Sequence, residues 1–319
     1  MSNGRSTANL ARKRVALAID RIAEPSGLAK TPSTAAVLVA LLAVYTIWGS
    51  TYFAIQVALE SLPPFLTAGT RFLVAGGILF AGLRLSGALA PSRLEWRNAA
   101  AIGALMLVGG NGGVVYAEQH VASSIAALAV ATSPLWVVLF TGFAEGWPHR
   151  AEWAGLAIGF AGVVLLNLGG DLRANPQGAV ALLISQITWS LGATLNRRLA
   201  LPAGLMAAAA EMLAGGVILA VLGLLLDAPS AVPPSARSLA ALAYLIAFGS
   251  IIGFSAFNYL IRNVRPAVAT SNAYVNPVVA VLIGVGLGGE RIGPLGGAAM
   301  ATILTGVLLV VLARQDALD

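Results

Sequence analysis

Ten long apolar stretches constrain this chain more than any other feature of its sequence. They cover residues 35–57, 65–83, 99–117, 121–144, 153–170, 178–196, 203–226, 239–261, 266–289 and 292–313. Each is close to the ~20 residues that a helix needs to cross a hydrocarbon layer of about 30 Å. Lipid tolerates only helices or closed barrels, because every backbone polar group must find a partner within the protein. The stretches are too long and too continuously apolar for barrel strands, so we expect an all-α integral membrane protein with ten transmembrane helices.

The composition excludes several other classes of protein. Charged residues make up only 10% of the chain, against about 25% in soluble domains. Cysteine is absent, and the two histidines, His120 and His149, lie in short connections. No expected span contains His or Asp, whereas intramembrane hydrolysis needs paired aspartates, a Ser–His pair or a metal. We therefore expect no enzymatic activity, no metal site and no cofactor.

The positions of the basic residues indicate how the chain lies in the membrane. If the N-terminus is cytoplasmic, 15 of the 19 Lys and Arg residues lie inside and three lie outside, at Arg173, Arg237 and Arg291. This excess predicts that both termini are cytoplasmic, with basic tails at 1–34 and 314–319. It also explains the net charge of +6 without a nucleic-acid partner. An organellar transit peptide is the alternative for residues 1–34, and Asp20 and Glu24 argue against it.

Two halves of the chain repeat each other. Trp48 corresponds to Trp189, and Gly76-Gly77 to Gly215-Gly216, at an offset that drifts from about 139 to 144 residues. The expected repeats are 35–170 and 178–313, with five helices in each. Because five is odd, the second repeat is inverted relative to the first, which is a recurring design of transporters. Such a pseudo-twofold axis predicts a binding site near the bilayer midplane that opens to either side in turn.

Several ordered motifs resemble one known group of proteins. The run from Ile47 to Phe53 (IWGSTYF), followed by Arg71-Phe72-Leu73, is similar to the start of EamA-type members of the drug/metabolite transporter superfamily. Asn276-Pro277 and Gly289-Glu290-Arg291 are similar to the end of that group. The resemblance implies ten helices in two inverted repeats and export of small metabolites, including amino acids, across the bacterial cytoplasmic membrane. Asn276 stands where many members have Glu, which removes one carboxylate that could couple transport to protons.

Polar and aromatic side chains within the spans are the candidates for a substrate cavity. Each amide or phenol needs a partner away from lipid, so a bundle without a cavity would rarely retain so many. The candidates are Tyr45, Trp48, Asn111, Tyr116, Gln186, Trp189, Asn258, Tyr259, Asn272 and Asn276. Asn272 and Asn276 share a helical face because they are four residues apart. Interface anchoring for the aromatics and interhelical hydrogen bonds for the amides are the alternatives.

Two charged residues lie well inside the expected spans, at Arg71 and Glu211. Charges in the membrane are costly, so each is a functional hypothesis by default. Arg71 would attract a substrate carboxylate, and Glu211 an ammonium group or a proton. Alternatively, both brace neighbouring helices or extend towards the nearer interface. They could pair directly only if spans two and seven are neighbours, which the sequence does not determine.

The leading hypothesis is a secondary transporter that exports small metabolites by alternating access, with aromatic amino acids favoured. The glycine-rich stretch 109–113 does not form a nucleotide site, because no strand precedes it and no Lys–Ser/Thr pair follows it. A proton-coupled exporter of drugs or cations is the first alternative, and a channel or scaffold is the second. The sequence leaves open the solute, the coupling and the oligomeric state. The expected partners are a small-molecule substrate and the lipid bilayer.

Overall fold

The structure is a computed structural model that describes residues 33–133, 135–137, 139–140, 150–168, 175–228, 232–264, 272–289 and 292–316. The chain divides into two compact units, Met1–Ala36 and Val37–Asp319, and the second unit is described below. The expectations for His149, Arg173, Glu290 and Arg291 lie outside the described residues, as do those for most of the two tails.

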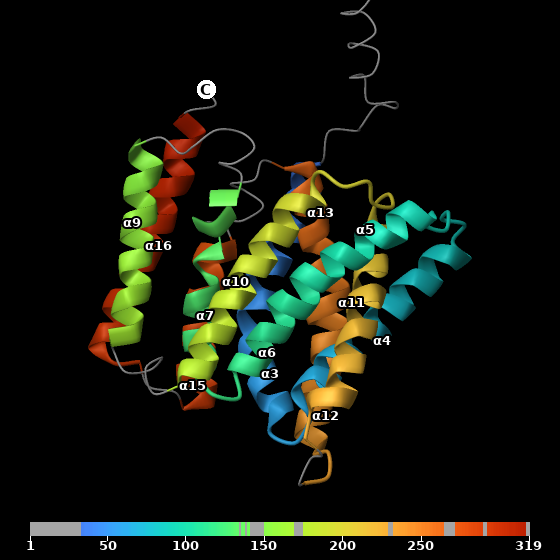
Figure 1. The fold of residues 1–319 in the computed structure, drawn as a ribbon, viewed down its shortest axis with the longest axis horizontal. Helices are drawn as coiled ribbons and strands as arrows, with labels where there is room; N and C mark the ends of the chain where they lie inside the picture. Colours follow the sequence, from blue (N-terminus) through green and yellow to red (C-terminus); the bar gives the residue numbers. More distant parts are fainter. Residues whose placement is uncertain are drawn as a thin grey trace, which may run out of the picture. The chain divides into compact units, whose positions relative to one another are not determined.

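The described part of the chain is entirely helical (Figure 1), which confirms the all-α prediction. Its α-helices are α2 (Thr34–Ala43), α3 (Gly49–Leu59), α4 (Pro64–Leu85), α5 (Arg93–Gly103), α6 (Gly113–Ala117), α7 (Ser123–Val130), α9 (Arg150–Leu168), α10 (Pro176–Asn196), α11 (Leu205–Leu226), α12 (Ala236–Tyr244), α13 (Ser255–Asn263), α15 (Asn272–Gly288) and α16 (Pro294–Asp316). Three π-helices interrupt them, η1 (Val44–Trp48), η2 (Ala104–Gly112) and η3 (Leu245–Phe254).

In the described part of the chain, six continuous helices are long and apolar enough to cross a membrane. They are Ala35–Leu59, Pro64–Leu85, Arg93–Ala117, Pro176–Asn196, Leu205–Leu226 and Ala236–Asn263. Three of these contain one π segment each, between two α segments. Shorter apolar helices coincide with other expected spans, such as Val275–Gly288. The chain is therefore a multi-pass membrane protein, whereas ten spans and cytoplasmic termini stay predictions.

Two of the helices that begin earlier than the apolar stretches indicated have a serine cap. The third span begins at Arg93 rather than 99, because Ser92 forms a capping box with Glu95. The Glu95 amide donates to Ser92 Oγ (3.3 Å) and the Ser92 amide donates to Glu95 Oε2 (2.7 Å). The eighth begins at Ala236 rather than 239, where Ser235 Oγ accepts from the Ser238 amide (3.0 Å). Such caps extend a helix through polar residues that hydropathy alone does not assign to a span.

The closest helix pairs join helices that occupy equivalent places in the two repeats. Helix α4 packs along α11, and α9 packs along α16 (Figure 1). Along the first pair, glycines on both helices face the partner's backbone: a Cβ at Gly69 would lie 2.6 Å from the Ala220 nitrogen, and one at Gly216 would lie 2.8 Å from the Leu73 nitrogen. Gly76 similarly faces Leu213.

These facing pairs also determine the direction of the helices. As the residue number rises along α4 from 69 to 73 to 76, the facing number falls along α11 from 220 to 216 to 213. The equivalent helices are therefore antiparallel, which is the relation that inverted repeats require. Glycines allow this close approach, and close packing stabilises helix pairs in lipid, where no hydrophobic difference drives them together.

Equivalent contacts also join the two repeats at opposite ends of the bundle. Ser238 Oγ donates to the Val57 carbonyl (2.9 Å), and Asn98 Nδ2 donates to the Ala200 carbonyl (2.8 Å). Residues 98 and 238, and residues 57 and 200, are separated by offsets within the range that the sequence repeat showed. One end has an additional contact, because Asp227 accepts from the amides of Phe65 (3.2 Å) and Leu66 (2.8 Å) at the start of α4.

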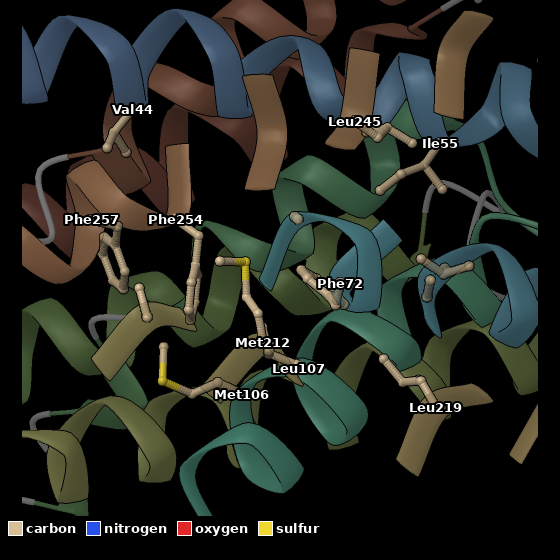
Figure 2. Packing of buried hydrophobic residues seen from close by; sticks show 14 of the residues in the cluster. Val44, Ile55, Phe72, Met106, Leu107, Met212, Leu219, Leu245, Phe254 and Phe257 are labelled. Atoms are coloured by element: carbon tan, nitrogen blue, oxygen red, sulfur yellow. The ribbon is translucent and has the colours of Figure 1, made fainter. Parts of the chain in front are cut away.

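The main hydrophobic core fills the space around α4 and α11. Figure 2 shows Phe72 of α4, Leu107 of η2 and Met212 of α11 in this core, and all three are buried. Phe254 of η3 and Phe257 of α13 belong to the same cluster. The core therefore joins residues of both repeats.

Replacing Gly76 with Ala tests the close contact between α4 and α11. Its Cβ would lie 2.9 Å from the Leu213 nitrogen, so the helices must move apart. We expect the free energy of unfolding to fall by about 1–2 kcal/mol, because overpacking outweighs the gain in helix propensity. The control is Gly77→Ala on the same helix, where a Cβ meets nothing within 4 Å. Equal thermal midpoints for the two variants in detergent would contradict this packing.

Candidate functional site

A cavity lies among residues of both repeats. The volume that the centre of a water molecule can occupy in it is about 90 Å³. About 10–15 Å³ of such space holds one water, so the cavity has room for several waters or for part of a small solute. Its wall includes Trp48, Arg71 and Asn111 from the first half of the chain and Gln186, Trp189 and Asn276 from the second. The structure thus brings together side chains that are far apart in the sequence.

All three π-helices contribute to the cavity wall. Trp48 is the last residue of η1, Asn111 lies in η2, and Gly249 and Phe254 lie in η3. The wider π-turn is frequent at functional sites. Segments η2 and η3 occupy equivalent places in the two repeats. The glycines around Asn111 were the only sequence signal for them, and helix packing explained those glycines equally well.

Three aromatic rings form one side of the cavity. The ring centroids of Trp48 and Trp189 are 5.7 Å apart at an angle of 76°, and Phe257 lies 4.7 Å from the first and 5.6 Å from the second. Trp48 Nε1 donates to the Gly249 carbonyl (3.1 Å), which satisfies its polar atom. The repeat-related tryptophans therefore touch each other, and we call these three residues the aromatic cluster.

Arg71 lies on the cavity wall with only 4% of its surface exposed. Its Nε donates to Ser250 Oγ (2.7 Å), which joins α4 of the first repeat to η3 of the second. Its buried Nη1 has no hydrogen-bond partner among the described residues. Glu118, which follows α6, acts on Arg71 electrostatically. A buried guanidinium with one unused donor at a cavity is suited to bind a carboxylate.

Two asparagine amides in the cavity wall supply hydrogen-bond acceptors. Asn111 Oδ1 and Asn276 Oδ1 are buried acceptors that no group in the described part of the chain hydrogen-bonds. Carbonyl oxygens of this kind accept hydrogen bonds from an ammonium or amide group. The cavity therefore presents an unused donor on Arg71 and unused acceptors on the two asparagines. Asn272 lies on the same face of α15 as Asn276 and also lines the cavity.

Gln186 lines the cavity too, but other groups already bind its amide. Ser133 Oγ donates to its Oε1 (2.6 Å), and its Nε2 donates to Ser185 Oγ (3.1 Å). Ser185 in turn donates to the Gly110 carbonyl (2.6 Å). This chain of hydrogen bonds matches the alternative interpretation of Gln186 as a brace between helices.

Four of the sequence candidates do not line this cavity, namely Tyr45, Tyr116, Asn258 and Tyr259. Tyr116 stacks on Phe65, with centroids 6.0 Å apart, beyond the cavity along α6. Tyr259 packs against the hydrophobic core. On a helix that presents Phe257 to the cavity, the following two residues point about 100° and 200° away from it. Hydropathy could not determine which polar residue of a span faces inwards.

Several lining residues were not among the sequence candidates. Phe254 and Phe257 line the cavity, but a phenylalanine in an apolar span looks the same whether it faces lipid or solute. Tyr52 and Ser185 line it as well. Only a position on the same helical face as Trp48 or Trp189, four residues away in each case, could have indicated them.

Glu211 lies outside the cavity and is completely buried. Asn196 Nδ2 donates to its Oε1 (2.8 Å), and Asn258 Nδ2 donates to its Oε2 (3.3 Å). Helices α4 and α11 are neighbours, so a pair with Arg71 was conceivable. However, the facing pairs place Glu211 opposite residue 78, which is seven residues and about 10 Å from Arg71. The two charges therefore belong to separate sites.

Comparison with known proteins agrees with this architecture. The chain matches the EamA-like transporter family over residues 34–168 and 176–312. It is 49% identical over 276 residues, which are 86% of this chain and 90% of the relative, to the "Uncharacterized inner membrane transporter YedA" of Escherichia coli K12. It is 28% identical over 281 residues, 85% and 92% of the two chains, to the "Probable terminal-alkyne amino-acid exporter" of Streptantibioticus cattleyicolor.

A crystal structure of a protein with 24% identity shares the fold, with a TM-score of 0.65 over 88% of this chain and 99% of the other.

Replacing Gly253 with Ala tests the placement of Trp48. A Cβ at this position would lie 2.5 Å from Trp48 Nε1, so the indole must rotate and lose its bond to the Gly249 carbonyl. We expect the near-UV circular dichroism of the coupled indoles to weaken and the stability to fall by about 1 kcal/mol. Gly286→Ala is the control, because a Cβ there meets nothing within 4 Å. An unchanged spectrum for Gly253→Ala would refute the placement.

Proposed function

This chain belongs to the EamA-like transporter family, and from that premise we propose that it exports small zwitterionic metabolites. Amino acids with aromatic side chains are the preferred substrates. The relative named an inner membrane transporter supports the bacterial cytoplasmic membrane as its location. The relative named an amino-acid exporter supports the substrate class.

The observation that carries this proposal is the unused donor of Arg71 beside the aromatic cluster in one cavity. In the proposed complex, the substrate carboxylate binds Nη1 of Arg71, and a charge-assisted bond of this type is about twice as strong as a neutral one. The substrate ammonium binds the free oxygens of Asn111 and Asn276. The aromatic side chain packs edge-on against Trp48, Trp189 and Phe257.

The position of this cavity between the repeats supports alternating access as the proposed mechanism. Lining residues come from both halves of the chain, and equivalent hydrogen bonds join the repeats near the two ends of the bundle at Val57–Ser238 and Asn98–Ala200. Breaking one contact while the other persists would open the cavity to one side at a time. The two states then exchange the roles of the repeats.

The charge of Arg71 weighs against an exporter of drug cations. A cationic solute in the same cavity would lie against a buried guanidinium, and like charges in a desolvated site repel each other. A channel is the other alternative. It is distinguished by counterflow, because a carrier exchanges labelled for unlabelled solute across the membrane and a channel does not.

Counterflow in proteoliposomes with a panel of labelled amino acids tests the proposed function. We expect exchange of tryptophan, phenylalanine and tyrosine to exceed that of small aliphatic amino acids. Trp48→Ala and Trp189→Ala each remove ring contacts worth about 1 kcal/mol beyond buried area, so exchange of the aromatic substrates should fall at least five-fold. Trp153→Ala is the control, because Trp153 is 46% exposed on α9. If both cavity variants exchange every panel member like the control, the aromatic cluster is not the substrate site.

Replacing Arg71 with Gln tests recognition of the carboxylate. Loss of a hydrogen bond to a charged group costs about 1.5–3 kcal/mol, so the apparent affinity for a free amino acid should fall about 10- to 100-fold. Competition by the corresponding amino-acid amide, which has no carboxylate, should change little between wild type and variant. An equal loss for the acid and the amide would show that Arg71 has a structural role only.

A further inference from the structure

We propose that Glu211 is a proton-binding site, separate from the substrate cavity, that takes up and releases one proton in each transport cycle. The inference deepens the proposed function, and it rests on that function for the identity of the solute that moves in exchange. Proton binding itself rests on the geometry around Glu211.

The first argument is the absence of a compensating cation at a fully buried carboxyl group. Glu211 has no exposed surface, and its two described partners are the neutral amides of Asn196 and Asn258. A permanently ionised carboxylate in the membrane interior is costly unless it is paired with a positive charge. A residue with only amide partners is therefore suited to lose and regain its charge.

Charged groups on the surrounding elements do not supply that pairing within the part of the chain that the structure describes. Arg262 of α13 acts on Glu211 electrostatically, but its guanidinium donates to the Pro202 carbonyl (3.0 Å) and the residue is exposed. Helices α4 and α5 and segment η2 also pack against α11. Their charged residues are Arg71, Arg84, Arg93, Glu95 and Arg97, none of which forms a described ion pair with Glu211.

The second argument is that asparagine fits both states of a carboxyl group. An amide has a donor and an acceptor. Its N–H groups bind the ionised form, as the distances of 2.8 and 3.3 Å record. The protonated form has an O–H that needs an acceptor, and Asn196 Oδ1 is buried in the same site without a hydrogen-bond partner in the part of the chain that the structure describes. Rotation of the Asn196 amide therefore satisfies the protonated carboxyl, which an arginine or lysine partner could not do.

The third argument is the position of Glu211 between the cavity and an end of the bundle. Asn196 is the last residue of α10 and is followed by the exposed residues Arg197 and Arg198. One turn earlier, Ala193 lines the cavity. Glu211 itself lies six residues from the start of α11, or about 9 Å along the helix axis. A proton that leaves Glu211 thus has a short route to water at this end of the bundle.

The site also contacts the part of the cavity that would sense a substrate. Asn258, which binds Glu211, directly follows Phe257 in the chain, and Phe257 packs against both Trp48 and Trp189. A change in the hydrogen bond between Asn258 and Glu211 can therefore shift the adjacent Phe257, which belongs to the aromatic cluster. In the cycle, Glu211 takes a proton from water when the site is open to the outside and gives it to water on the cytoplasmic side. One proton enters for each zwitterion exported, so one positive charge moves inwards in each cycle.

Infrared difference spectroscopy of the purified, reconstituted protein tests the proton site without any substrate. A pH change should produce a carboxyl band in wild type that is absent in Glu211→Gln. The control is Glu95→Gln, because glutamine preserves the capping box at Ser92 and should leave the band intact. A band that persists in Glu211→Gln, or no band in wild type, would overturn the proposal.

Transport measurements test the coupling. With wild type, an imposed outward proton gradient, with the liposome lumen more acidic than the medium, should drive accumulation of a labelled aromatic amino acid, at least five-fold above the level without a gradient. Glu211→Gln should still exchange solute in counterflow but should lose this gradient-driven accumulation, whereas Glu211→Asp should retain part of it. Accumulation that survives in Glu211→Gln, or loss of counterflow in that variant, would overturn the coupling role. If wild type moves no amino acid but the infrared band is present, the proposed function fails while the proton site stands.

Discussion

The close contact between α4 and α11 is the interaction on which the rest of this structure depends. Lipid provides no hydrophobic force that pushes helices together, so association relies on close packing and hydrogen bonds. Gly69 and Gly76 on one helix and Gly216 and Gly223 on the other remove the side chains that would keep the backbones apart. Because equivalent helices of the two repeats meet here, this contact also fixes the antiparallel relation of the repeats.

The two buried charges have different environments although they lie on equivalent helices of the two repeats. Arg71 and Glu211 occupy almost equivalent positions in the two repeats. Because α4 and α11 are antiparallel, the two residues lie on opposite sides of the midpoint of this helix pair. Arg71 therefore reaches the cavity and Ser250 of the other repeat. Glu211 instead lies among residues of its own repeat, Asn196 and Asn258. Equivalent positions of the two repeats therefore form two chemically different sites.

The sequence predicted the class of fold and part of the site, and particular residues show where the limit lies. The correspondence of Trp48 and Trp189 led correctly to two residues that meet, because a repeat carries long-range information. Gly76 and Gly77 look alike in the sequence, yet only Gly76 faces a neighbouring backbone. Asn258 and Phe257 are adjacent, but the phenylalanine lines the cavity and the asparagine does not. These distinctions depend on helix rotation, which an apolar helix in lipid does not reveal through its hydropathy pattern.

The positions of the π-helices indicate where the two repeats are alike and where they differ. Segments η2 and η3 lie at equivalent places, so this distortion either existed before one half was copied or arose twice. Segment η1 has no counterpart in α10, which is α-helical throughout its described length, so the halves have diverged at this point since duplication. The divergence falls on Trp48 and leaves Trp189 on a regular helix. The cavity wall therefore departs from exact twofold symmetry at Trp48, so the two repeats present different backbone geometry to the same space.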